Sequence, residues 1–207
     1  IFQIPEKLYG RESEVSELLS HFNSVASTGK SKITLISGYS GVGKSSLIRE
    51  IYKPITASSG YFLSGKFDQF NKNIPFNAII QIFTKIIQNL LGESNQGIEN
   101  WKRKILSALG TNAKIIIDII PELEFIIGKQ PDYQELTGQE NTNRFFIVFK
   151  KFLNIFTAKE HPIAIFIDDM QWADSASLNL LSNVLKDSNT NYLYIILTYR
   201  MNEVNSS

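Results

Sequence analysis

One eight-residue stretch constrains the fold of this chain more than any other. Residues 38–45 read Gly-Tyr-Ser-Gly-Val-Gly-Lys-Ser, which is the G-x-x-x-x-G-K-S pattern of a Walker A loop. Its glycines let the backbone curl until several N–H groups point at one anion. The pattern needs a strand before the loop and a helix after it, and residues 32–36 and 45–52 read as these two elements. We expect Pro54 to end the helix, because proline lacks a backbone N–H.

The side chains at the end of this loop predict phosphate and metal binding. Lys44 would place a positive charge on the β- and γ-phosphates, and the Ser45 hydroxyl would ligate Mg²⁺. The N-terminus of the following helix would face the same phosphates. The expected cofactor-binding residues of the loop are Gly38, Tyr39, Ser40, Gly41, Val42, Gly43, Lys44, Ser45 and Ser46.

Composition excludes several other classes of protein. The 207 residues carry a formal net charge of +1, so no strong field attracts nucleic acid or an anionic membrane. The absence of cysteine excludes disulfides and thiolate metal sites and suits a cytoplasmic location. No uncharged apolar run reaches the ~20 residues that span a bilayer. The chain begins at Ile1 without a signal peptide, and we interpret it as a piece of a longer protein.

Hydrophobic periodicity predicts an α/β domain with a parallel sheet. Apolar runs at residues 61–67, 163–167 and 192–197 read as further strands, alternating with helices. Helices are expected at residues 12–26, from Pro75 onward, around 98–109, at 113–120, at 143–156 and at 175–185. The expected organisation is a single nucleotide-binding domain: residues 1–67 with the Walker A loop, a mostly helical annex at 68–160, and two strands within 161–207.

A second group of candidate site residues follows the last two predicted strands. Asp168 ends a buried apolar run, at the strand end where open α/β sheets bind ligands, and would hold Mg²⁺ through water. Asp169 would orient the attacking water, although its side chain is shorter than glutamate and hydrolysis would be slow. Arg200 ends the last strand and would contact the γ-phosphate, so that ATP and ADP are distinguished. The alternatives are two solvated loop carboxylates and a surface arginine.

Other polar residues have ordinary interpretations. Asp174 precedes a helix and reads as an N-cap, with Ser177 at the third position. Lys66 follows a strand and would reach the nucleotide, but a solvated charge is the simpler interpretation. Arg144 lies near the start of an aromatic-rich helix, where a helix-surface arginine is the default.

These motifs together resemble a known family. The run LYGRE at residues 8–12, the GYSGVGKSS loop, IFIDDMQWADSASL and LTYR-x-NEV are similar to the ATPase domain of STAND-class P-loop proteins, which are relatives of AAA+ ATPases. The similarity extends to SGKFDQF, PELEFIIGKQP and NRFFIVFKKF, and points to large multidomain bacterial sensor serine/threonine–histidine kinases. It covers nearly the whole chain.

The resemblance implies further properties. Gly10 and Arg11 match a motif near the adenine and ribose, Asp168 and Asp169 match the Walker B pair, and Arg200 matches the sensor 1 arginine. The strand ending at Arg200 would lie between the Walker A and Walker B strands, which gives the order 1-4-3-2. A fifth strand and a C-terminal lid normally follow in this family and are not expected within these residues.

The favoured function is an ATP-binding switch with slow hydrolysis, which relays signals between flanking kinase and sensor domains of the same parent chain. Alternatives are a small-molecule or nucleotide kinase, a DNA-associated AAA+-like ATPase, and a scaffold that binds nucleotide without turnover. A kinase usually needs an arginine-rich lid, which is not evident, and the near-neutral charge gives no basic stripe for DNA.

Overall fold

The computed structural model describes residues 10–39, 44–58 and 60–201. The chain divides into two compact units. The first contains Ile1–Asp68, Ala158–Trp172 and Asn191–Ser207 and carries the sheet, and the second contains Gln69–Thr157 and Ala173–Thr190.

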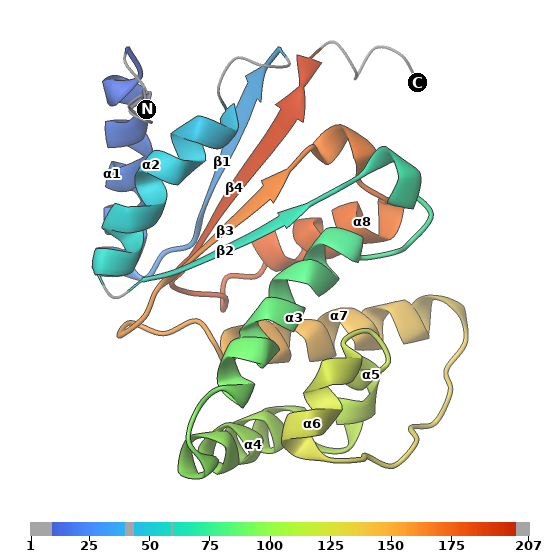
Figure 1. The fold of residues 1–207 in the computed structure, drawn as a ribbon. Helices are drawn as coiled ribbons and strands as arrows, with labels where there is room; N and C mark the ends of the chain where they lie inside the picture. The colour runs from blue at the N-terminus through green and yellow to red at the C-terminus, as the bar shows by residue number, and fades with distance from the viewer. Residues whose placement is uncertain (1–9, 40–43, 59, 202–207) are drawn as a thin grey trace, which may run out of the picture. The chain divides into compact units, whose positions relative to one another are not determined.

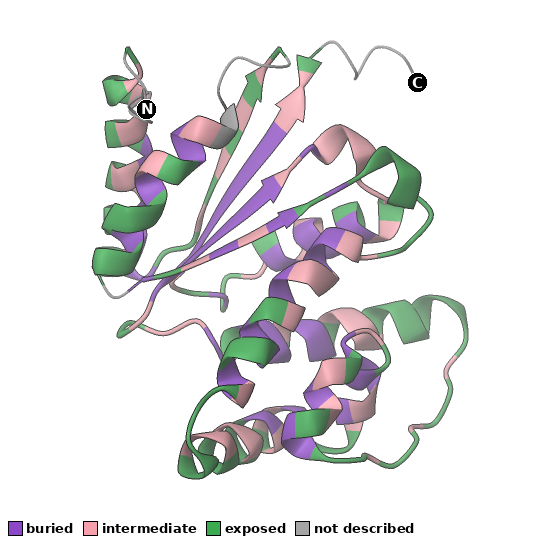
Figure 2. Cartoon of the chain, viewed as in Figure 1, coloured by how far each residue is buried: buried purple, intermediate pink, exposed green. Residues whose placement is uncertain are grey.

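The first unit is built on a four-stranded sheet in the order β1-β4-β3-β2 (Figure 1). Its strands are β1 Lys32–Gly38, β2 Tyr61–Lys66, β3 Ile163–Asp168 and β4 Leu193–Arg200, and every neighbouring pair is parallel. This confirms the predicted α/β fold and the order 1-4-3-2. The central strands β3 and β4 are largely buried, as continuous apolar runs predict, whereas β1 is more exposed (Figure 2).

Helices α1 Glu12–Thr28 and α2 Lys44–Ala57 pack together and cover one face of this sheet. Apolar side chains at helical spacing on both helices meet alternate residues of the central strands. The buried cluster that they form contains Leu18, Phe22, Val25, Leu47, Ile48, Ile51, Ile55, Ala164, Phe166, Tyr194 and Ile196. This packing fixes α2, which follows the Walker A loop in the sequence, against the sheet.

The expectation that Pro54 ends α2 is wrong. The helix continues through Pro54 to Ala57, and Ser58 then donates its backbone N–H to the carbonyl of Pro54 at 3.2 Å. Pro54 is exposed, while Ile51 and Ile55 on either side of it are fully buried. Proline removes one backbone hydrogen bond from the helix, and burial of the neighbouring isoleucines outweighs that loss.

The second unit is helical. Its helices are α3 Asn77–Leu91, α4 Asn95–Leu109, α5 Ala113–Ile117, α6 Glu124–Ile127, α7 Gly138–Asn154 and α8 Ser175–Leu185. Helix α5 ends earlier than the predicted residue 120, because Ile120 precedes a proline and takes a φ of −126°. Among the described residues, no helix is long and apolar enough to cross a membrane.

Aromatic rings join the helices of the second unit. Phe83 of α3 lies 5.3 Å from Phe149 and 5.2 Å from Phe152 of α7, measured between ring centroids. Trp101 of α4 stacks on Phe156 at 5.6 Å. These contacts explain the aromatic side of α7 that the sequence pattern predicts.

Candidate nucleotide-binding site

The candidate site residues of the first unit meet at the carboxyl ends of its four parallel strands. Gly38 pairs with Arg200 in the register of β1 and β4, and Lys66 pairs with Asp168 in the register of β2 and β3. The Walker A loop therefore leaves β1 beside Arg200. Ligands bind at this edge in open α/β sheets.

The Walker A loop lies between β1 and α2, as the sequence predicts. Ser40, Gly41, Val42 and Gly43 fall outside the described residues, and only the backbone of Lys44 and Ser45 is described, as the start of α2. Tyr39, just after β1, is exposed. The N-terminus of a 14-residue helix therefore follows the loop directly, which is the arrangement that favours an anion.

Asp168 is held by one of its two carboxylate oxygens. Its Oδ1 accepts hydrogen bonds from the fully buried Thr198 hydroxyl and from the backbone N–H of Asp169, the latter at 3.0 Å. Within the described part of the chain, no donor is bonded to Oδ2. An oriented carboxylate with one oxygen available is a donor that suits Mg²⁺. Asp168 is therefore suited to the metal-ligand role that the sequence predicts for it, and the shared metal site with Ser45 stays a prediction.

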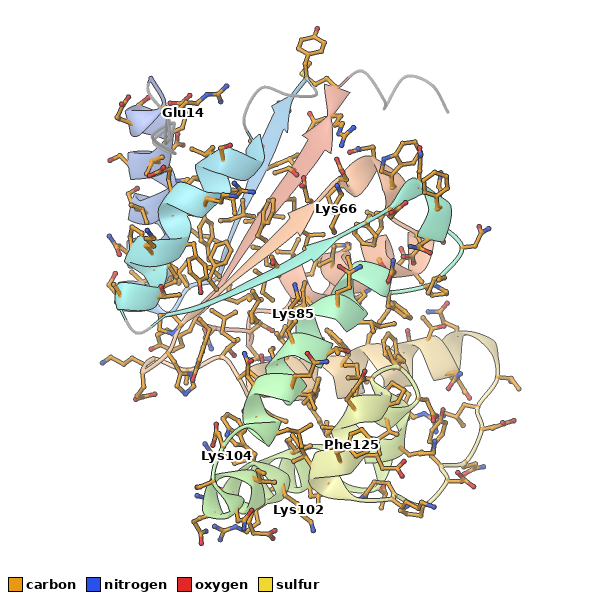
Figure 3. The ribbon with its side chains drawn as sticks, viewed as in Figure 1. Glu14, Lys66, Lys85, Lys102, Lys104 and Phe125 are labelled. Carbon is orange, nitrogen blue, oxygen red and sulfur yellow. The ribbon has the colours of Figure 1, made fainter. Side chains whose placement is uncertain are left out.

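Asp169 is buried, with 3% of its surface exposed, and accepts four interactions. Arg200 binds it in a bidentate manner, with Nε 2.9 Å from Oδ1 and Nη2 3.1 Å from Oδ2. Gln171 donates its Nε2 to Oδ1 at 3.0 Å, and the Lys66 ammonium lies 3.2 Å from Oδ2. Lys66, at the carboxyl end of β2, keeps 58% of its side chain exposed (Figure 3).

These partners determine the charge of the buried carboxylate. Burial alone would raise the pKa of Asp169. The hydrogen bonds from Gln171 and Lys66 and the Arg200 guanidinium outweigh burial, so the pKa of Asp169 lies below its usual value. The carboxylate is therefore ionised at neutral pH.

The backbone at Asp169 is left-handed. Its φ is +57°, which is uncommon outside glycine and is best tolerated by Asn and Asp. The carbonyl of Asp169 accepts the backbone N–H of Trp172 at 3.0 Å, which closes a tight turn after β3. This turn brings the carboxylate back toward the ends of β2 and β4.

Arg200 lies at the predicted edge, beside the start of the Walker A loop, and its guanidinium binds Asp169. Only 29% of its side chain is exposed. The guanidinium is therefore held by an ion pair, while both the contact with the γ-phosphate and the surface-arginine alternative stay predictions.

Gly10 and Arg11 immediately precede α1. Gly10 has a φ of +82°, and the Arg11 guanidinium lies 3.8 Å from the Glu14 carboxylate. Their assignment to the adenosine end stays a prediction.

Sequence reasoning missed part of the site. Lys66 was expected as a solvated charge and instead pairs with Asp169. Gln171 and Thr198 carry no charge and no recognisable spacing, so only the strand register reveals them. The position of Gln171 within the turn after Asp169 is the one signal that would have suggested it.

The other two polar residues have structural partners in the second unit. Asp174 is the predicted N-cap of α8, and its Oδ1 accepts the backbone N–H of Ser177 at 2.8 Å. Arg144 donates to the carbonyl of Gln134 at 2.6 Å and lies 4.8 Å from the ring centre of Tyr133. Arg144 therefore anchors the segment before α7.

A solved structure and several curated proteins are similar to this chain. The crystal structure of Cdc6p from Pyrobaculum aerophilum aligns with a TM-score of 0.51 at 11% identity, covering 99% of this chain and 42% of that one. This likeness supports the P-loop NTPase fold.

The regions that are similar in sequence to this chain belong to much longer proteins. Hybrid signal transduction histidine kinase G of Dictyostelium discoideum is 38% identical over 186 residues, which is 90% of this chain. Histidine protein kinase 1 of Candida albicans is 26% identical over 201 residues, or 89% of this chain. The chain spans only 5% and 8% of the lengths of these two relatives. Both are eukaryotic, so a bacterial parent stays a prediction.

The family assignment rests on a match along most of the sequence. The family model described as an AAA ATPase domain matches residues 7–197, which include the Walker A loop, both aspartates after β3 and most of β4. The chain belongs to the AAA ATPase domain family.

Proposed function

We propose that this AAA ATPase domain binds ATP with Mg²⁺, hydrolyses it slowly, and acts as a STAND-class switch within a multidomain signalling protein. One observation carries the proposal: the start of the Walker A loop at the end of β1, the pair Asp168 and Asp169 at the end of β3, and Arg200 at the end of β4 lie at the same end of the sheet. The similarity to histidine kinases supports a signalling role.

Each of the proposed site residues would have a distinct task. Asp168 and Ser45 would hold Mg²⁺, which would neutralise phosphate charge when bound. Asp169 would orient the attacking water. Arg200 would sense the γ-phosphate, which adds charge in ATP that ADP lacks. A group that interacts differently with ATP and ADP is what a nucleotide switch requires.

Slow turnover agrees with the surroundings of Asp169. Its two oxygens each accept two donors, which is about the full capacity of a carboxylate. A water molecule would have to displace one donor before Asp169 could orient it. The low pKa also makes this carboxylate a weak base.

Nucleotide binding is tested by calorimetry with ATP·Mg²⁺ and ADP·Mg²⁺ on the 207-residue chain and on a longer form of the protein. Lys44→Ala removes the charge placed on the β- and γ-phosphates and should weaken ATP binding at least tenfold, while Lys53→Ala on the exposed side of α2 should not. Equal ATP affinity in the wild type and Lys44→Ala would refute the proposal.

The competing activities are separated by following radiolabelled ATP. A switch releases labelled phosphate, whereas a small-molecule or nucleotide kinase transfers the label to an added acceptor. A DNA-associated ATPase would instead bind duplex DNA with an affinity that falls steeply with salt. Label transfer to an acceptor, or salt-dependent DNA binding, would replace the proposed switch.

A further inference from the structure

We propose that Gln171 is a positioning residue of this site, which uses its side-chain amide to hold the Asp169 carboxylate and the end of β4 in one fixed arrangement. The inference rests on the proposed function, because it assigns a role beside the groups that would orient water and sense the γ-phosphate.

The amide of Gln171 bridges two elements that are remote in sequence. Gln171 lies in the short 3₁₀ turn Met170–Trp172 after β3. Its Nε2 donates to Asp169 Oδ1 at 3.0 Å, and its Oε1 accepts the backbone N–H of Arg200 at 3.1 Å. One side chain therefore contacts the carboxylate and the main chain of the residue that carries the guanidinium.

These bonds complete a closed ring. Gln171 links Asp169 to the Arg200 backbone, and the Arg200 side chain returns to Asp169 through Nε and Nη2. Arg200 has a long side chain, and fixing its backbone limits the positions that its guanidinium reaches. Asp169 sits on a left-handed turn, so its carboxylate direction also depends on side-chain contacts.

Glutamine is the residue type that this bridge requires. It presents a donor and an acceptor on one planar group. Glutamate at this position would keep the acceptor for Arg200 but would place a second anion beside Asp169. Methionine has a similar length and offers neither a strong donor nor a strong acceptor. The two substitutions therefore remove different parts of the bridge.

The test measures phosphate release, as kcat and KM, together with the ATP/ADP affinity ratio. Gln171→Met removes both hydrogen bonds of the bridge and should lower kcat roughly tenfold, with a smaller change in KM. It should also narrow the ATP/ADP affinity ratio, because Arg200 is less well placed. Gln171→Asn keeps the amide on a shorter side chain and should recover part of kcat.

Gln171→Glu adds a readout that a purely structural role would not change. Two carboxylates side by side raise the apparent pKa of the pair. The acid limb of the rate profile should therefore move to higher pH in Gln171→Glu and should move less in Gln171→Met. Gln139→Glu, on the exposed start of α7, is the matched control and should leave the profile unchanged.

The outcomes distinguish this inference from the proposed function. If the wild type and Lys44→Ala bind ATP equally, the proposed function fails and the positioning role fails with it. If the wild type binds and hydrolyses ATP, the inference is overturned when the Gln171 variants keep the wild-type kcat, affinity ratio and acid limb. It is also overturned when the Gln171 variants lower the unfolding temperature but leave kcat, the ATP/ADP affinity ratio and the acid limb unchanged.

Discussion

Asp169 combines a buried charge with an uncommon backbone conformation. Its substitution by asparagine removes the charge and keeps a residue type that tolerates this conformation. Asparagine tolerates the left-handed φ of +57° as well as aspartate does. Asp169→Asn should lower the free energy of unfolding at pH 7 by about 2 kcal/mol, because the bidentate bond to Arg200 loses its charge. Urea unfolding measures the difference.

The same variant has a defined pH dependence. The pKa of Asp169 is lowered by folding, so its stabilisation is full above the unfolded-state pKa of about 4 and is lost as the pH falls through the folded-state value. The difference in the free energy of unfolding between wild type and Asp169→Asn should therefore shrink as the pH falls below about 4. Asp132→Asn, at an exposed loop position, is the control. A difference that stays constant with pH would contradict this account.

Lys66 makes the most exposed of the contacts to Asp169, and we expect it to limit hydrolysis. Lys66→Met keeps the apolar stem and removes the ammonium that lies 3.2 Å from Oδ2. Water would then reach this oxygen, and phosphate release at neutral pH should rise roughly two- to fivefold. Loss of the positive charge would also raise the pKa of Asp169, so the acid limb of the rate profile should move to higher pH.

Lys53→Met removes an exposed lysine from α2 and serves as the control for Lys66→Met. A slower phosphate release in Lys66→Met, with unchanged ATP binding, would mean that the ammonium assists the reaction.

The sequence predicted Asp168, Asp169 and Arg200 as candidate site residues, but it predicted neither the role of Lys66 nor the partners of these groups. Asp168 and Asp169 follow one predicted strand and Arg200 ends another, and that pattern places them at one end of a parallel sheet. Whether Arg200 contacts phosphate or Asp169 depends on strand order and on the turn at Asp169, and neither follows from local spacing. Gln171 is a neutral residue within that turn, so its two hydrogen bonds follow only from the folded structure.

At the scale of elements, periodicity predicted most long helices well and the short ones poorly. Helix α7 is an exception among the long helices, because it begins at Gly138 and ends at Asn154 instead of spanning the predicted residues 143–156. Helix α8 has the predicted bounds, and α3 and α4 end at the predicted glycines. Helix α6, with only four residues, is too short to show a period and was not predicted. The error at Pro54 has another cause: tertiary burial of the residues around it overrides the local preference of proline.

The N-cap of α8 is an element that can be weakened by a single substitution. Asp174 accepts the backbone N–H and the hydroxyl of Ser177, and its Oδ2 also accepts the backbone N–H of Phe76 at 3.2 Å, just before α3. Asp174→Ala should lower the free energy of unfolding by about 1 to 2 kcal/mol, measured by urea unfolding. Ser94→Ala removes the exposed cap of α4, with its one bond to Gly97, and should cost less.

Equal losses in Asp174→Ala and Ser94→Ala would show that the bond to Phe76 adds nothing to the cap. Asp174→Asn keeps a capping oxygen and should recover part of the loss in Asp174→Ala.

At the scale of the whole molecule, β1 is the outer strand on one side of the sheet in the first unit. Strand β1 pairs with β4 alone among the described strands, although it carries the Walker A loop. Ile33 and Leu35 of this strand are 46% and 59% exposed. An uncovered edge strand with apolar side chains favours pairing with a further strand. The proposed STAND-class assignment implies such a strand, and we propose that it pairs with β1 in a longer form of the protein.

Hydrogen exchange of the β1 amides tests this proposal, because alternate N–H groups of β1 point away from β4. In the 207-residue chain these outward amides should exchange quickly. In a longer form that contains the fifth strand they should exchange at least about tenfold more slowly, since each would gain a backbone partner. The outward amides of β2, at the opposite edge of the sheet, provide the internal control and should exchange equally in both forms. If the β1 amides exchange at the same rate in both forms, no strand has added to this edge, and the Walker A loop follows an edge strand in the longer protein too.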